Sequence, residues 1–314
     1  MKVSYIVKRI ISAVVIMLAV ATIIFFCLRV LPGDPAIVIL GDSASEEALK
    51  VIRSQLGADR PIWIQYFDYI GKLLVGDLGV SMITKQPAGM QIWNMFPYTL
   101  NLAISSMIIG VLIGIPIGIW TAIRKNTLFD YVGRVFALVG FSFPAFYLGV
   151  LLLMIFSIEL GLFPIIHQIR TGSISEHLYK LCLPALSIGL IEASFITRLT
   201  RSCMLEVLNE DYVRTAFAKG LKPNRVYFIH ALKNVMIPVI TAVGFYTGTI
   251  LAGAVLTETV FNRPGLGKLL IGAINTRDYT LVQACLVTFS FIIVVVNLIV
   301  DLSYSLFDPR VKYE

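Results

Sequence analysis

Long apolar blocks separated by shorter polar segments organise this chain. The blocks lack the every-second-residue alternation of membrane-spanning strands. Because a helix needs about 20 residues to cross the hydrocarbon layer of a bilayer, each block predicts one spanning helix. The expected helices cover residues 10–31, 100–123, 135–159, 181 to about 201, 237–261 and 281–307. We therefore predict an all-α, polytopic membrane protein with six transmembrane helices.

The polar-mixed segment between the first two blocks, residues 32–97, is too long to be a bare connection. In SASEEALKVIRSQL, Ser43 or Ser45 is placed to cap a following helix. In PIWIQYFDYIGKLLVGDLG, Pro61 stands at a helix start and apolar residues recur at helical spacing. We expect short amphipathic helices on the outer face of the membrane, where they cap the bundle or receive a partner.

Two features inside the blocks concern helix packing and shape. Gly110, Gly114 and Gly118 form two overlapping GxxxG steps in the second block. Small residues at this spacing let helix backbones approach closely within lipid. Pro116 and Pro144 predict kinks in the second and third blocks, because proline removes a helical hydrogen bond.

Composition excludes a large soluble domain. Hydrophobic residues make up 57% of the chain and charged residues 14%, whereas about a quarter of a soluble domain is charged. The first apolar block is longer than the apolar region of a secretory signal, so we interpret it as a retained span. The four cysteines and three histidines are dispersed without a CxxC pair, so we expect neither a metal site nor a disulfide.

The net charge of +7 reflects cytoplasmic loops rather than nucleic-acid binding, since lysine and arginine favour the inner side of a membrane. The basic residues in or beside the loops that follow the second and fourth blocks are Arg124, Lys125, Arg134, Arg198, Arg201, Arg214, Lys219, Lys222, Arg225 and Lys233. This distribution predicts both termini in the cytoplasm. The expected domains are an N-terminal span with a long extracytoplasmic segment (1–97), a five-helix transmembrane domain with an inner loop at about 205–236 (98–307), and a cytoplasmic tail (308–314).

One ionisable residue, Glu192, lies inside the fourth block in SIGLIEASFITRL. An acid within a membrane costs a few kcal/mol, so it should face the protein interior or water. Two interpretations stay open. Glu192 lines a pathway and contacts a cationic part of a substrate, or it is a structural acid that is bonded to a neighbouring helix or to Arg198, or that lies at a shallower depth in the membrane.

The chain contains no GxxxxGK[ST], HExxH or GxSxG pattern. The nearest string, RPGLGKLL, lacks the first glycine spacing and the hydroxyl of a phosphate-binding loop. We therefore expect a transport subunit rather than an enzyme, with no catalytic residues and no cofactor of its own. Uphill transport would then draw energy from an ion gradient or from another subunit.

A polar stretch, EDYVRTAFAKGLKPNRVYFIHALKNVMIP, separates the fourth and fifth blocks. It predicts two helical halves around Gly220, because glycine permits the positive φ that ends a helix and Pro223 suits a helix start. A helical pair with one apolar side suits docking onto a partner protein. A helix lying flat on anionic lipid is the other interpretation that the pattern allows.

The residues YVRTAFAKGL, followed by HALKN and IPVI, closely resemble the cytoplasmic loop of binding-protein-dependent ABC importer permeases. More narrowly, they resemble the B-type subunit of the dipeptide/oligopeptide/nickel permease family. LRVLPGDPA, LTETVFNRPGLGKLL and NLIVDLSYSLFDPR resemble other family segments in the same order, over nearly the whole chain. The wider class begins this loop with Glu-Ala-Ala, where Arg214, Thr215 and Ala216 stand here, as in the peptide/nickel subfamily.

The resemblance implies a type I ABC importer transmembrane fold in the cytoplasmic membrane of a bacterium or archaeon. It implies a pathway, shared with a second permease, for a short peptide, nickel, a metal chelate or glutathione delivered by an external binding protein. Two partner ATPase subunits would hold ATP and Mg. The implied ATPase-coupling residues are Asp211, Tyr212, Arg214, Thr215, Ala216, Ala218, Gly220 and Leu221. The alternative, a self-contained ion-coupled secondary transporter, predicts inverted repeats and midplane acids.

Overall fold

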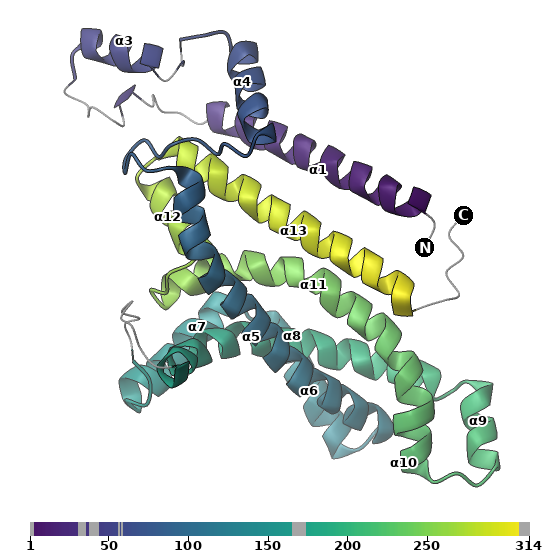
Figure 1. Cartoon of the computed structure of the whole chain (residues 1–314). Helices are drawn as coiled ribbons and strands as arrows, with labels where there is room; N and C mark the ends of the chain where they lie inside the picture. Colours follow the sequence, from purple (N-terminus) through teal and green to yellow (C-terminus); the bar gives the residue numbers. More distant parts are fainter. Residues whose placement is uncertain are drawn as a thin grey trace. The chain divides into compact units, whose positions relative to one another are not determined.

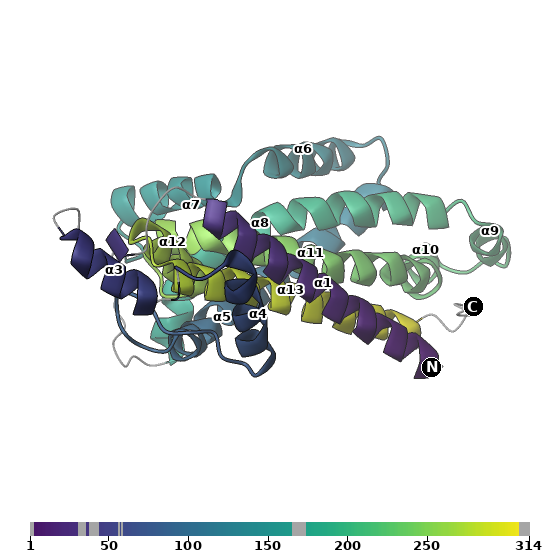
Figure 2. The same ribbon diagram turned by 90° about the horizontal axis from the view of Figure 1, so that it is seen from above.

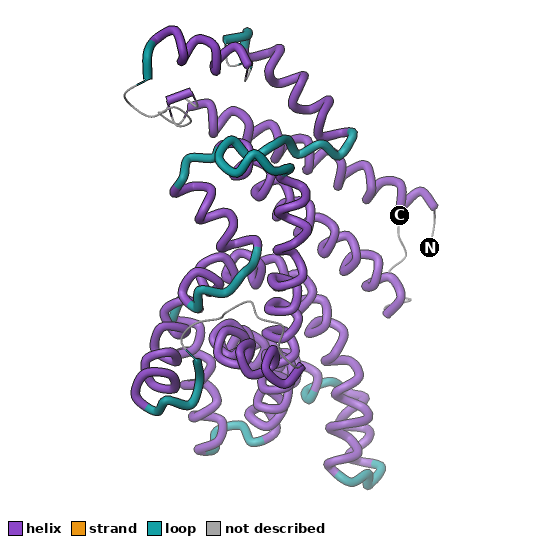
Figure 3. Tube along the Cα trace, turned by 60° about the vertical axis from the view of Figure 1, so that its left-hand side comes forward, coloured by secondary structure: helices purple, strands orange, loops and turns teal. Residues whose placement is uncertain are grey.

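Helices make up nearly all the secondary structure of the computed structural model, which describes residues 3–30, 36–37, 44–55, 57, 59–164 and 174–307. Within these residues the only β-type pairing is an isolated bridge between Val80 and Pro87. Figure 3 shows helices joined by loops. The all-α prediction is confirmed, and the predicted tail, 308–314, lies outside the described residues.

The long helices agree with the expected spans (Figure 1). They are α1 (Val3–Val30), α5 (Ala88–Ile123), α8 (Ile174–Val207), α11 (Leu232–Val260) and α13 (Tyr279–Phe307). Five helices are long and apolar enough to cross a membrane, and a bent helix pair raises the number to six among the residues described. Pro116 lies within the uninterrupted α5.

The third expected span is not one continuous helix. It consists of α6 (Leu128–Ser142), α7 (Ala145–Leu153) and a π-helical turn (Met154–Glu159), and α6 is bent by 101° from the α7 segment. The break falls at Pro144, as the sequence predicted, but it is far sharper than a kink. Phe143 takes an extended conformation with ψ 136°, because the ring of a following proline disfavours helical backbone.

The bent pair runs along the length of α8. Three contacts mark its course: Asp130 with Arg201, Gly140 with Ser194, and Gly149 with Ser187. The partners move from the end of α8 towards its start as the chain advances through α6 and α7 (Figure 2). We therefore interpret the pair as a single broken span, which gives the six spans expected.

The glycines of α5 bring its backbone close to α8. A Cβ atom added at Gly114 would lie 2.8 Å from the Ala193 carbonyl oxygen, and one at Gly118 would lie 2.8 Å from the Thr197 carbonyl oxygen. Any larger side chain would push the helices apart. The close approach predicted from the GxxxG steps is confirmed.

The chain divides into two compact units, and the boundaries between them fall in or beside α5, α11 and α13. One comprises Met1–Thr99 and Pro264–Leu298, the other Leu100–Arg263 and Ile299–Glu314. The first unit contains α3 (Glu46–Gln55), α4 (Ile62–Leu74) and α12 (Leu266–Asn275). The two short helices predicted between the first and second spans are thus confirmed, and the Ser45 hydroxyl accepts the Ala48 N–H at 3.3 Å.

Asp278 organises the loop of the first unit that leads into α5. Its buried carboxylate accepts hydrogen bonds from the Ser81 hydroxyl and from the backbone N–H groups of Met82 and Ile83. It also accepts the Leu281 N–H and so caps α13. One carboxylate therefore holds a loop and a helix start that lie almost 200 residues apart in the chain.

Candidate functional site

The polar stretch between the fourth and fifth spans forms a short helix beyond the ends of α8 and α11 (Figure 1). This helix is α9 (Asp211–Ala218). A turn leads to α10 (Pro223–Arg225) and a π-helical segment (Val226–Ala231), which continues into α11. The predicted helix–glycine–helix arrangement is confirmed, with the second helix continuous with the fifth span.

The end of α9 is closed by backbone hydrogen bonds. Gly220 has φ 75°, its N–H donates to the Phe217 carbonyl at 2.9 Å, and the Leu221 N–H donates to the Ala216 carbonyl at 3.3 Å. This pair of bonds is a Schellman arrangement, which glycine favours because it lacks the Cβ atom that penalises a positive φ. The turn therefore has a defined shape rather than acting as a loose link.

The inner face of α9 packs against the segment that follows it. Val213 and Ala216 form a buried cluster with Val226, and Leu221 packs against this cluster. Ala216 is 7% exposed. Two of the predicted coupling residues, Ala216 and Leu221, thus contribute to internal packing.

The outer face of α9 is exposed and polar. Six predicted coupling residues lie there or in the turn that follows: Asp211, Tyr212, Arg214, Thr215, Ala218 and Gly220. Arg214 and Asp211 lie 3.7 Å apart, with side chains 71% and 98% exposed. The Tyr212 hydroxyl accepts a hydrogen bond from the Asn234 amide at 2.7 Å, which ties α9 to α11. The face therefore presents charges and hydroxyls on a braced helix.

Continuous packing connects α9 to the helix bundle. Val207 and Leu208 pack against the α9 cluster and also against a larger core that includes Ile196, Met204 and Val235. Because protein interiors are close-packed, a displacement of α9 is passed to α8 and α11 rather than absorbed. This geometry suits a segment that transmits force.

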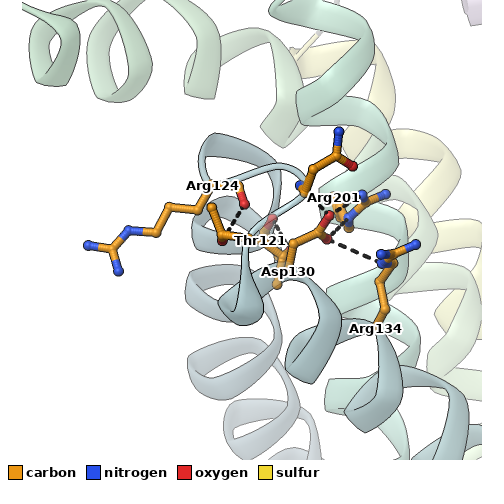
Figure 4. A network of polar contacts seen from close by, with 8 residues as sticks. Thr121, Arg124, Asp130, Arg134 and Arg201 are labelled. Carbon is orange, nitrogen blue, oxygen red and sulfur yellow. Dashed lines mark hydrogen bonds and ion pairs between the residues drawn. The ribbon is translucent and has the colours of Figure 1, made fainter.

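A buried carboxylate joins α6 to α8 within the same unit (Figure 4). Asp130 has no exposed side-chain surface, and Arg201 donates to both its oxygens, from Nε at 2.8 Å and from Nη2 at 3.0 Å. Arg134 Nε lies 3.5 Å from the same carboxylate, and the Asn126 N–H donates to it at 3.0 Å. The cluster fastens the start of the broken span to the end of α8.

Asp130 was not among the predicted site residues. Arg134 and Arg201 were predicted as loop cations that set the orientation, with no partner assigned. The available signal was an acid at the start of an apolar helix, four residues before Arg134, which is the spacing of a helical ion pair. The pairing with Arg201, 71 residues away, has no local signal.

Glu192 is fully buried in α8. Its side chain lies against Gly110, where an added Cβ would be 2.7 Å from Glu192 Cγ, and neither carboxyl oxygen has a hydrogen-bond partner among the described residues. The predicted bond to a neighbouring helix or to Arg198 is therefore not made. In this conformation Glu192 is also closed off from solvent, so its place in a pathway stays a prediction.

Two family models together match almost the whole chain. The model described as "Binding-protein-dependent transport system inner membrane component" matches residues 114–313, and the model of the corresponding N-terminal region matches residues 2–103. The chain belongs to this permease family. The prediction of an importer permease from the sequence motifs is confirmed, and with it the multi-pass inner-membrane location.

Curated relatives place the permease in the peptide branch of the family. It is 42% identical to the glutathione transport system permease protein GsiC of Salmonella choleraesuis, over 99% of both chains. It is 39% identical to the dipeptide transport system permease protein DppB of Alkalihalophilus pseudofirmus and 38% identical to the di/tripeptide transport system permease protein DppB of Pseudomonas aeruginosa, again over 99% of each chain. These relatives are transport subunits, which confirms that the permease is not an enzyme.

The fold of the permease also matches a solved importer. The inward-facing MetNI methionine ABC transporter aligns with a TM-score of 0.59 and 16% identity, over 70% of this chain and 97% of the other. The predicted type I ABC importer transmembrane fold is thereby confirmed. Membership in the family implies an ATPase and a binding protein as partners.

Proposed function

We propose that α9 is the surface through which this permease responds to ATP bound by a partner ATPase subunit. The observation that carries the proposal is the exposed, charged outer face of a helix whose inner face is packed into the bundle. A force-transmitting contact must be stiff, and the closed turn at Gly220 and the Tyr212–Asn234 bond supply stiffness. No nucleotide-binding pattern occurs in the chain, so ATP must act through a neighbour.

The proposed assembly holds this permease, a second homologous permease, two ATPase subunits and an extracytoplasmic binding protein in a lipid membrane. Both termini and α9 lie in the cytoplasm, in agreement with the basic loops. Closure of the ATPase pair on ATP would draw the α9 segments together and turn the bundle outward, and hydrolysis would reset it. To shift the ratio of outward-facing to inward-facing permease from 1:99 to 99:1, the ATP-bound ATPase pair must bind the outward-facing state about 5.5 kcal/mol more tightly.

We propose a short peptide as the solute, glutathione included. Relatives whose printed names specify glutathione, a dipeptide and a di- or tripeptide support this choice, since all three solutes are small peptides. Within the pathway, Glu192 is the candidate contact for a peptide ammonium group, and Glu192→Gln tests it through the rate of transport. An unchanged transport rate in that variant would assign Glu192 to structure alone.

A charge reversal on α9 tests the coupling role. In the reconstituted complex, we expect Arg214→Glu to lower solute-stimulated ATP hydrolysis by about tenfold or more, because removing one partner of an interfacial charge pair costs about 2 kcal/mol or more. Lys50→Glu, the same reversal at an exposed position on α3, is the matched control and should leave stimulation unchanged. If Arg214→Glu left solute-stimulated ATP hydrolysis normal, α9 would not dock on the ATPase. Altered binding of this variant to anionic vesicles would then show that α9 contacts lipid.

A further inference from the structure

A cavity of about 310 Å³ lies within the first unit, between α1, α4 and the start of α13. Its volume is near the lower end of the range for small-molecule sites, about 300–1,000 Å³. The wall combines apolar groups, including the stacked rings of Phe25 and Tyr69 with centroids 5.5 Å apart, with several charged side chains. The cavity plays no part in the proposed role of α9, and the family assignment gives it no function.

The charged groups of the cavity leave positive charge uncompensated. Three cations and two acids line it, which leaves a net charge of +1: Arg29, Arg60, Lys72, Asp68 and Asp77. Asp68 lies 3.4 Å from Arg60, and Asp77 accepts the Gly79 N–H at 2.8 Å but keeps its charge. Arg29 and Lys72 have exposed side chains and no ion pair with any described residue, and the Arg29 guanidinium lies 5.2 Å from the centre of the Phe25 ring. The cavity therefore suits an anion.

The wall of the cavity also contains a buried contact between Tyr69 and Gln283. The Tyr69 hydroxyl and the Gln283 amide nitrogen have almost no exposed surface and no hydrogen bond of regular geometry to any described residue. Burial raises the pKa of Tyr69, and a weak hydrogen bond with Gln283 opposes this with a smaller effect. These two groups support the wall and are covered, so the groups that a ligand can reach are the exposed cations.

The surroundings of the cavity are those of a membrane interface. Arg29 is the last residue of the spanning stretch of α1. The helix α4 carries exposed Trp63, Phe67 and Leu74 together with Lys72, which is the pattern of a helix lying at the headgroup level. A phosphate with an apolar body attached fits this position better than a free ion does.

We propose that this cavity binds the phosphate group of an anionic phospholipid, held by the exposed side chains of Arg29 and Lys72. Basic pockets between spanning helices recognise anionic headgroups on the cytoplasmic side of membranes, and the same charge pairing applies to an anionic headgroup in the outer leaflet, where the predicted topology puts this cavity. The apolar part of the lipid would lie along exposed apolar residues of α1 on the same helical face as Phe25 and Arg29, such as Leu18, 37% exposed, and Val14, 50% exposed. Bound lipid would then brace α1 and α4 together.

Lipid binding to the delipidated full-length chain tests this proposal by native mass spectrometry. Phosphatidylglycerol should bind at least tenfold more tightly than phosphatidylcholine, and Arg29→Gln combined with Lys72→Gln should remove that preference. Arg29→Lys, which keeps the charge, should retain it. Lys50→Gln, which removes an exposed lysine of α3 outside the cavity, should also retain it.

The outcomes separate the sources of the anion. Equal binding of the two lipids, or a preference unaffected by the double substitution, would overturn the proposal. Inorganic phosphate that displaces phosphatidylglycerol at matched concentration would assign the cavity to a free anion and overturn the lipid assignment. Each variant is first matched to the unmodified chain in thermal unfolding, so that a loss of binding reports the site rather than the fold.

Discussion

Removal of the Asp130 carboxylate should destabilise the bundle more than any surface ion-pair substitution. In Asp130→Ala, Arg201 loses a two-bond partner, Arg134 loses an ion pair, and the Asn126 N–H loses its acceptor. The guanidinium of Arg201, whose side chain is 20% exposed, is then left beside α8 without a counter-charge. The contact that joins α6 to α8 is lost with it.

The size of the effect follows from the burial of the cluster. Breaking a fully buried ion pair costs about 3–5 kcal/mol. Asp130 is fully covered, but the arginines over it are 20% and 45% exposed, so water can compensate part of the loss. We expect about 2–3 kcal/mol in the free energy of unfolding, which corresponds to a roughly 30- to 150-fold change in the unfolding constant.

Equilibrium unfolding of the purified chain in mixed micelles, titrated with SDS and followed by circular dichroism, measures this change. Glu46→Ala is the control, since its carboxylate lies 3.7 Å from Arg53 but is 78% exposed. An exposed pair contributes about 1 kcal/mol or less. Arg201→Ala and the double substitution complete a cycle, in which the two single losses should not add. The role of the Asp130–Arg201 ion pair would be refuted if the two single losses of stability added up in the double substitution. A loss for Asp130→Ala no larger than that for Glu46→Ala would also refute it.

Two further substitutions test the helix packing and the outer loop. Gly114→Ala would place a Cβ 2.8 Å from the Ala193 carbonyl oxygen and should cost about 1–3 kcal/mol in the same titration. Gly253→Ala, where nothing lies within 4 Å, should be neutral or slightly stabilising, and equal effects at the two glycines would contradict the packing argument. Asp278→Ala should speed backbone hydrogen exchange at residues 81–83 by about tenfold or more, because an acceptor lost from a buried site costs about 1–3 kcal/mol. Unchanged exchange there would show that the Ser81 loop holds its shape without Asp278.

The long helices and α9 were predictable because their causes are local. A backbone in lipid must satisfy its own hydrogen bonds, so an apolar block of sufficient length forms a helix wherever it packs. The end of α9 also has a local cause, because Gly220 and Pro223 favour the observed turn. The resemblance to the permease family rested on local motifs in a fixed order, and the family models that match the chain confirm it.

The positions of single polar residues were not predictable in this way. The apolar side of α9, with Val213 and Ala216, was predicted to suit docking onto a partner, but the structure covers this side with the following segment of the chain. An amphipathic pattern shows that a helix has a side to be covered and does not show whether the chain itself or a partner covers it. Pro144 predicted a bend, yet its 101° angle depends on how α6 and α7 each pack against α8. The partners of Asp130 depend on residues brought together from distant segments, and so does the lack of a hydrogen-bond partner for Glu192 within the described part of the chain.

The sequence alone determined that this protein is a six-span helical permease with a short polar helix between its fourth and fifth spans. The length of an apolar block sets whether it can span the membrane, and glycine and proline affect only the backbone within a few residues. These effects can therefore be predicted from the sequence. Only the tertiary structure decided which face of α9 is free, which carboxylate clamps α6 to α8, and where a cationic cavity opens beside α4. Those features arise from pairs of groups far apart in sequence, whose distance and burial are set by packing.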